Sequence, residues 1–277
     1  MLVAVVGHVE WIRFARLDHV PPVGGIGHAT ETWEGPGGGG GVAATQLAKL
    51  AGACTFFTAL GDDELGRRSR ERLTEEDIEI HAAVRSDTPT RSALTMIDDA
   101  GERTIVTLGE RLEPRGGDPL PWTLLARADA VFLTASDEVG VRLARRARLL
   151  VVTSRILELL GRSGVRADVV IGSASDPAES YEAGVLRSQP GIVVRTEGAS
   201  GGTWETDRGE RGRYEAAPLP GPIADAYGAG DSFQAGLTYG LASGMGLSDA
   251  LRLAARCGAR AVTGRGPTGG QLTAAEL

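Results

Sequence analysis

At residues 225–237 the chain reads Asp225-Ala226-Tyr227-Gly228-Ala229-Gly230-Asp231-Ser232-Phe233-Gln234-Ala235-Gly236-Leu237. Small residues let a backbone turn sharply and approach a ligand. The apolar pattern after them predicts a helix, whose free N–H groups at the start attract negative charge, above all phosphate. A carboxylate there would repel a phosphate, so we interpret Asp231 as a base that deprotonates a hydroxyl attacking a phosphate. A turn with an aspartate helix cap is the alternative.

Composition narrows the class of protein. The chain is 42% hydrophobic and 23% charged, which is typical of a globular protein, and its 277 residues suit one large α/β domain or one domain with a small appendage. We expect a single domain over residues 1–277. A net charge of −7 gives no reason to expect nucleic-acid binding. No apolar run reaches the roughly 18 residues of a membrane span, and residues 1–7 do not resemble a secretion signal, so we expect no membrane association and a cytoplasmic location. Cys54 and Cys257 lie far apart and predict neither a disulfide framework nor a zinc site.

Two familiar nucleotide-binding motifs are missing. Lys49 is the only lysine among the 29 Lys and Arg residues, and it does not follow a glycine, so a Walker-type phosphate loop is excluded. Gly7 ends the apolar run 2–6, but the next five residues contain no glycine, which disfavours a nicotinamide-dependent dehydrogenase. Backbone N–H groups, arginine and metal are left to bind any phosphate.

Apolar runs alternate with helical patterns along most of the chain. This alternation predicts a three-layer α/β/α sandwich with a mostly parallel central sheet. We expect its strands at 2–6, 54–60, 130–134, 149–153, 169–171 and 192–196, and helices at 42–51, 67–74, 237–241 and 250–262.

A second, smaller sheet is expected beside the first. Residues 13–33 favour short exposed strands, and residues 92–98 and 103–107 flank the hairpin turn Asp99-Ala100-Gly101-Glu102. We therefore expect a β-sheet lid formed by about 13–33 and 88–109.

A run of glycines, 37–41, precedes the helix expected at 42–51. Glycines at a helix start admit a polyhydroxy ligand against the backbone. A disordered linker is the alternative, and the helix that follows immediately disfavours it.

Taken together, these segments resemble the ribokinase-like (PfkB) family of carbohydrate and nucleoside kinases. Residues 225–231 are similar to that family's Asp-Thr-x-Gly-Ala-Gly-Asp motif, with Ala226 in place of Thr. Residues 38–41 and Gly61-Asp62-Asp63-Glu64-Leu65-Gly66 resemble its N-terminal motif, and Thr196-Glu197-Gly198-Ala199-Ser200-Gly201 resembles its nucleotide turn. Four such patterns in order are specific, although each one alone is weak.

The resemblance implies a carbohydrate kinase, a phosphotransferase (EC 2.7.1) that moves the γ-phosphate of ATP, with Mg²⁺, to a hydroxyl. In this assignment Asp231 is the base and the N–H groups of Gly228, Ala229 and Gly230 form the anion hole. The resemblance also implies ATP-binding residues, acceptor-binding residues and a monovalent cation, K⁺ being the candidate, near Asp225 and the loop around Gly264 and Gly266. The ATP-binding set is Thr196, Gly198, Gly201, Gly228, Gly230 and Cys257, and the acceptor-binding set is Glu10, Trp11, Gly38, Gly39 and Arg103.

Several positions depart from the family pattern. Ile12 stands where many of these sugar kinases have a carboxylate, so Glu10 is the candidate acceptor ligand, with Trp11 available to stack on a sugar or base. Ala43 replaces the usual Asn. The family's Asn-x-x-Glu corresponds to Ser173-Ala174-Ser175-Asp176, where Asp176 would act on Mg²⁺ through water, and a shifted register favours Glu179 instead.

Two classes of function therefore remain. The first is a small-molecule kinase whose acceptor is a sugar or sugar-like molecule, with a nucleoside as second choice and a sugar phosphate also open. The second is a non-catalytic sugar- or nucleotide-binding relative. A homodimer formed through the lid is a further expectation for either class.

Overall fold

The computed structural model describes residues 1–182 and 184–277, which form two β-sheets and six α-helices. The main sheet has nine strands in the order β13-β12-β11-β10-β9-β8-β1-β4-β5, all parallel except β12 and β13. Its strands are β1 (Val3–Val6), β4 (Cys54–Gly61), β5 (Ile78–Arg85), β8 (Ala130–Leu133), β9 (Leu149–Thr153), β10 (Val169–Ser173), β11 (Ile192–Thr196), β12 (Gly202–Thr206) and β13 (Arg211–Tyr214).

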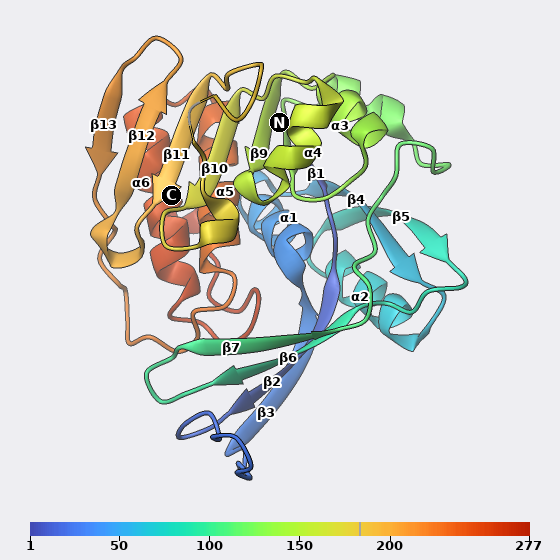
Figure 1. The fold of residues 1–277 in the computed structure, drawn as a ribbon, viewed down its shortest axis with the longest axis vertical. Helices are drawn as coiled ribbons and strands as arrows, with labels where there is room; N and C mark the ends of the chain where they lie inside the picture. Colours follow the sequence, from blue (N-terminus) through green and yellow to red (C-terminus); the bar gives the residue numbers. More distant parts are fainter. Residues whose placement is uncertain (183) are drawn as a thin grey trace.

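Helices cover both faces of this sheet (Figure 1). One face carries α1 (Gly38–Ala51), α2 (Glu64–Thr74), α5 (Ala229–Ala242) and α6 (Leu247–Ala261). The other carries α3 (Glu138–Ala144) and α4 (Leu157–Ser163). The α/β/α sandwich predicted from the alternating pattern is therefore confirmed. Within the described residues, no helix is both long and apolar enough to span a membrane.

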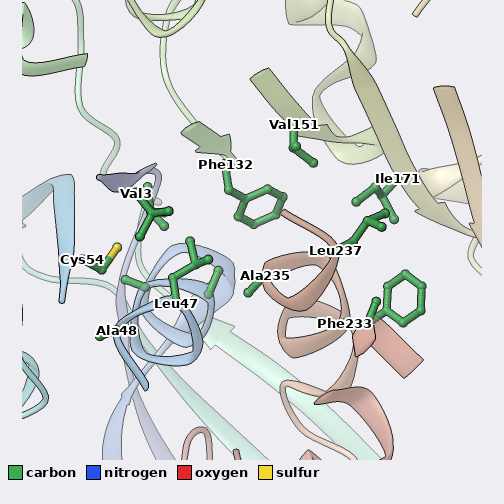
Figure 2. Close-up of a cluster of buried hydrophobic side chains, with 14 of the residues drawn as sticks. Val3, Leu47, Ala48, Cys54, Phe132, Val151, Ile171, Phe233, Ala235 and Leu237 are labelled. Atoms are coloured by element: carbon green, nitrogen blue, oxygen red, sulfur yellow. The ribbon is translucent and has the colours of Figure 1, made fainter. Parts of the chain in front are cut away.

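The apolar core explains why α1 and α5 lie side by side on the sheet. Figure 2 shows Leu47 of α1 and Ala235 of α5 gathered against Val3 and Phe132, which lie on neighbouring strands. All four side chains are almost inaccessible to solvent. Burying them holds the two helices, and hence their N-terminal ends, at the carboxyl edge of the sheet.

The small sheet has the strand order β3-β2-β6-β7 and extends from one end of the sandwich (Figure 1). Its strands are β2 (Glu10–Arg16), β3 (Glu31–Gly37), β6 (Ser92–Ile97) and β7 (Arg103–Leu108). We call this sheet the lid. Residues 17–30, expected to contain strand, connect β2 to β3 without strand structure, and β2 is mostly buried rather than exposed because its inner face packs on the body.

Boundaries of the predicted elements shift in informative ways. The helix expected at 42–51 begins at Gly38, so most of the glycine run forms its first turn. The helix expected at 237–241 begins at Ala229, directly after Gly228. Both helices therefore start inside the glycine-containing motifs. Strands β5, β12 and β13 were not predicted, because their sequences are short or mix polar and apolar residues.

Strand β1 marks the point where the order of the main sheet reverses. The chain continues from β1 to β4 on one side and later returns to β8 on the other. Ligands of open α/β sheets bind beyond the carboxyl ends of the strands at such a reversal. Gly7 and His8 follow β1 and Thr134 follows β8, so this edge is where a site is expected.

Candidate active site

The N-terminus of α5 begins with a left-handed glycine. Gly228 has φ of +77°, and a Cβ atom at this position would lie 3.0 Å from the carbonyl oxygen of Pro267 and 3.0 Å from Val42 Cγ1. Only glycine fits both the backbone conformation and the space. Among the described residues, the N–H groups of Gly228, Ala229 and Gly230 have no hydrogen-bond acceptor, so they are free to bind an anion.

Asp231 lies in the first turn of this helix and is half-buried. Burial raises the pKa of its carboxyl group to about 6, an effect that Arg103 opposes and Glu179 reinforces. Its carboxylate accepts no hydrogen bond from the described residues. A carboxylate with this pKa is ionised at neutral pH and retains enough basicity to accept a proton from a hydroxyl.

The N-terminus of α1 faces the same carboxylate. A Cβ atom on Gly39 would lie 3.1 Å from Asp231 Oδ1, and one on Gly40 would lie 2.6 Å from the carbonyl oxygen of His8. Gly38 has φ of +76° and donates its N–H to the hydroxyl of Tyr227 at 2.9 Å. The glycine run thus brings the backbone of α1 against both β1 and the start of α5.

Tyr227 joins three parts of the site. Besides accepting from Gly38, its ring packs edge-on against Phe14 of the lid with 5.4 Å between ring centres. The guanidinium of Arg103 lies 5.8 Å from the centre of the tyrosine ring, and Arg103 also donates to the carbonyl of Ala226 at 2.5 Å. The residue that the motif leaves unspecified therefore connects the anion loop, α1 and the lid. Sequence reasoning missed it, because its position in the motif carried no chemical expectation.

Asp225 is fully buried and joins two loops through hydrogen bonds. Its oxygens accept the N–H of Tyr227 at 2.8 Å and the N–H of Gly266 at 3.0 Å. Burial raises the pKa of this carboxyl group, and the two hydrogen bonds oppose the rise. The loop around Gly264 and Gly266, proposed as a source of cation ligands, is held directly beside Asp225. No cluster of three or more His, Cys, Asp or Glu side chains suited to a metal occurs in residues 1–182 and 184–277.

Glu10 and Trp11 point to opposite faces of β2. Glu10 is 7% exposed and contacts Arg91 at 3.2 Å. Trp11 is 1% exposed, donates its indole N–H to Glu34 at 3.0 Å and lies under the guanidinium of Arg68. Successive residues of a strand alternate between its faces, so Trp11 is directed away from the site and the idea that it stacks on an acceptor needs correction. Its neighbour Ile12 is fully buried in the lid interface.

The nucleotide turn expected at Thr196–Gly201 follows β11. Thr196 Oγ1 donates to the carbonyl of Gly172 at 3.4 Å, and Glu197 donates its N–H to the carbonyl of Gly201 at 2.7 Å. Gly198 and Gly201 both have positive φ, so the turn depends on glycine at these two positions. Cys257, by contrast, is fully buried between α5 and α6 against Gly236. Its thiol, whose pKa burial raises to about 12, lies in the core and does not line the site.

Of Glu179 and Asp176, it is Glu179 whose charge raises the pKa of Asp231. Glu179 accepts the N–H of Ser173 at 2.8 Å, pairs with Arg155 at 2.6 Å, and raises the pKa of Asp231. Asp176 also pairs with Arg155 at 2.6 Å, but it accepts the N–H of Ala178 at the start of a short 3₁₀ turn and is more exposed. Of the two registers left open by the sequence, this arrangement favours Glu179.

A family comparison agrees with this geometry. The family model described as pfkB family carbohydrate kinase matches residues 1–151 and 142–274. This chain belongs to the pfkB family of carbohydrate kinases. Gly228–Asp231 and the glycine run at Gly38–Gly41, which meet at the site, both lie within the matched residues.

Individual members of the pfkB family resemble this chain over most of its length. A fructokinase of Klebsiella pneumoniae is 26% identical over 270 residues, which cover 83% of this chain and 87% of that protein. An ATP-dependent ribose-1-phosphate kinase of Halopiger xanaduensis is 25% identical over 266 residues, covering 91% and 89%. The structure of Arabidopsis thaliana ribokinase complexed with ribose and ATP matches the fold with a TM-score of 0.77 and 18% identity, covering 99% of this chain and 96% of that one.

Proposed function

We propose that this protein is an ATP-dependent kinase that phosphorylates a hydroxyl group of a sugar or sugar-like acceptor. The observation that carries the proposal is the position of Asp231, a carboxylate with raised pKa one residue beyond the free N–H groups of Gly228, Ala229 and Gly230. Membership of a carbohydrate kinase family supports it, as do the names fructokinase and ribose-1-phosphate kinase of two relatives.

In the proposed reaction Asp231 accepts the proton of the acceptor hydroxyl as the hydroxyl oxygen bonds to the γ-phosphorus of ATP. The bond between that phosphorus and the oxygen bridging it to the β-phosphate breaks, so that ADP leaves with the bond's electron pair. The free N–H groups at the start of α5 stabilise the charge on the transferring phosphoryl group. Thr196, Gly198 and Gly201 are proposed to bind the nucleotide, since their turn lies at the carboxyl end of β11.

Carboxylate and phosphate oxygens are the ligands that Mg²⁺ prefers, and it keeps several waters in such sites. Glu179 fits this role best, because it is 11% exposed and electrostatically coupled to Asp231. When bound with ATP, Mg²⁺ would neutralise charge that builds up on the phosphates. K⁺ beside Asp225, a homodimer through the lid and a cytoplasmic location remain parts of the proposal that rest on the sequence and the family resemblance.

The lid fits a role in excluding water, which competes with the acceptor hydroxyl. Its inner face is apolar and packs on Tyr227 through Ile12 and Phe14. Arg103, from β7 of the lid, donates to the carbonyl of Ala226 beside the anion loop, and its charge lowers the pKa of Asp231. We propose residues 1–277 as a single catalytic unit, with Gly38, Gly39, Glu10 and Arg103 on the acceptor side.

The proposal is tested by measuring ADP formation from Mg²⁺-ATP across sugars, sugar phosphates and nucleosides. We expect one acceptor class to stimulate ADP formation well above the ATP-only rate, with a phosphorylated product detected by mass spectrometry. ATP binding without phosphoryl transfer to any acceptor would favour the non-catalytic alternative. Preferential phosphorylation of nucleosides would contradict the sugar assignment.

A further inference from the structure

Three charged or titratable side chains meet beside the carboxyl end of β1, and a fourth, Arg111, affects the pKa values of two of them. His8 follows β1, Glu10 begins β2, Arg91 precedes β6, and Arg111 lies just after β7. Arg91 contacts Glu10 at 3.2 Å, and His8 Nε2 lies 3.6 Å from the same carboxylate. We call His8, Glu10, Arg91 and Arg111 the His8 cluster. It lies next to Asp231, because a Cβ atom on Gly39 would approach both the His8 ring and Asp231 Oδ1 within 4 Å.

The two arginines of the cluster have unused donors. Within the described residues neither guanidinium makes a hydrogen bond, and the Nε of Arg91 is buried without a partner. Arg111 approaches only Glu113, with 3.6 Å between Nη2 and Oε2. An arginine side chain carries five N–H donors, and burying such donors unpaired is costly. Within the described residues the buried Nε of Arg91 thus lacks a partner, and the exposed guanidinium of Arg111 is free to bind one from solution.

His8 does not add a positive charge to this cluster. Burial, together with the charges of Arg111 and Arg91, lowers the pKa of its imidazole to about 3. The ring is thus neutral at physiological pH, and its Nδ1 is buried without a hydrogen bond. Arg91 and Arg111 also act on Glu10, whose pKa burial raises and the two arginines lower. Both guanidiniums therefore act electrostatically on His8 and Glu10, and Arg91 is in direct contact with Glu10.

The surface beside the cluster offers little to a neutral polyol. The inner face of the lid next to Glu10 is formed by Ile12, Phe14 and Ala93, all almost inaccessible to solvent. Glu10, the one carboxylate on this side of β2, is already held by Arg91. Recognition of a ligand here depends on the arginines, whose planar fork matches the geometry of a phosphate or carboxylate group.

We infer that the acceptor carries an anionic group, a phosphate monoester or a carboxylate, that Arg91 and Arg111 bind while a hydroxyl of the same molecule faces Asp231. This inference rests on the proposed kinase function and names the class of its acceptor. Free sugars and nucleosides lack the anionic group and leave the guanidinium donors unpaired. Either anion would complete charge-assisted hydrogen bonds with both arginines.

The test measures binding separately from turnover. Dissociation constants are determined by titration calorimetry for ribose, ribose 1-phosphate, ribose 5-phosphate, fructose, fructose 1-phosphate, fructose 6-phosphate, glucose and gluconate. The proteins are the wild type and the variants Arg111→Gln, Arg91→Gln and Arg13→Gln. Arg13 serves as the matched control, because it is 68% exposed on the outer face of the lid. Arg111→Gln removes only a 3.6 Å ion contact, so it tests the idea if Arg91→Gln fails to fold.

We expect at least one phosphate ester or the sugar acid to bind at least ~10-fold more tightly than its parent sugar. Arg111→Gln should abolish that difference, and Arg13→Gln should preserve it. Equal binding of charged and uncharged sugars by the wild type, or an unchanged preference in Arg111→Gln, overturns the inference. Efficient phosphorylation of free sugars by ATP would overturn it while leaving the kinase assignment intact. Arginine-dependent binding of an anionic sugar without any phosphoryl transfer would uphold the binding site and defeat the kinase assignment.

Discussion

Gly39 and Asp231 approach each other so closely that a methyl group on Gly39 would lie 3.1 Å from Asp231 Oδ1. This distance is shorter than an ordinary contact between a methyl carbon and an oxygen. It shows why the glycine run and the motif at the start of α5 belong to one structure, although 191 residues separate them in the sequence, from 39 to 231. The absence of a side chain on Gly39 leaves the base free to move toward an acceptor.

Replacing Gly39 by alanine tests this relationship. The new methyl group should displace the carboxylate by a few tenths of an ångström, and misplacement of a catalytic group is costly. We expect kcat to fall about tenfold or more with little change in the KM for ATP. Gly35→Ala is the control, since a Cβ atom there would have no neighbour within 4 Å. A Gly39→Ala enzyme with wild-type kcat would show that the close approach has no catalytic role.

The raised pKa of Asp231 predicts a defined pH profile. Because a base must be deprotonated, kcat/KM should fall about tenfold per pH unit as the pH drops below about 6. A carboxyl group whose pKa is higher in the folded than in the unfolded state, where it is about 3.9, destabilises the folded state above that folded pKa. The penalty disappears as the pH falls below the unfolded pKa.

Asp231→Asn should therefore raise the free energy of unfolding at pH 7.5 by about 1–2 kcal/mol, a value reduced for partial solvent screening. The gain should shrink as the pH falls below about 6 and vanish below about pH 4, as urea titrations at several pH values would reveal. A constant difference across this range would mean that burial does not perturb the carboxyl group.

The connection between the start of α2 and the segment that leads into β6 depends on Asp63. Its carboxylate caps α2 through the N–H of Gly66 at 2.8 Å and accepts both the N–H and the hydroxyl of Thr90 at 2.7 Å, just before β6. Asp63→Ala removes all three bonds, so we expect a loss of about 2–3 kcal/mol in the free energy of unfolding. Asp62→Ala changes the exposed neighbour and should stay within about 0.5 kcal/mol of the wild type. Equal losses in urea titrations of the two variants would contradict this role.

Substitutions of Glu179 and Asp176 should affect the Mg²⁺ dependence of the reaction differently. Glu179→Gln should lower kcat at least ~10-fold, raise the Mg²⁺ concentration needed for half-maximal rate, and move the acid limb of the pH profile to lower pH, because Glu179 raises the pKa of Asp231. Asp176→Asn should change these quantities by less than about threefold, since Asp176 mainly caps a short turn. Kinetics as a function of Mg²⁺ distinguish the two, and a larger effect of Asp176→Asn would restore the original register.

Much of the fold could be predicted because its signals are local. Apolar runs such as 149–153 and 192–196 form parallel strands wherever both faces are buried, and the alternation with helices fixes the layers. Strand β12 and the edge strand β13 escaped prediction, because they are short and their residues are mostly polar or half-exposed. Their strand structure comes from pairing with β11 rather than from their own sequence pattern.

The site was predictable only where backbone chemistry determines it. The roles of Gly228 and Asp231 could be predicted because the N-terminus of a helix binds anions, and this feature can be recognised in the sequence. Tyr227, Arg91 and Arg111 could not be found in this way, because their roles depend on contacts with residues distant in the chain. Successive side chains of a strand point to opposite faces, so the sequence of β2 alone could have shown that Glu10 and Trp11 face opposite ways.

The central claim is that Asp231 is the base of a phosphoryl transfer. The most direct measurement is the single-turnover rate of Asp231→Asn with Mg²⁺-ATP and the best acceptor, together with its affinity for ATP. We predict a rate at least ~10²-fold below that of the wild type and an ATP affinity within about threefold of it. A rate equal to that of the wild type would contradict the account.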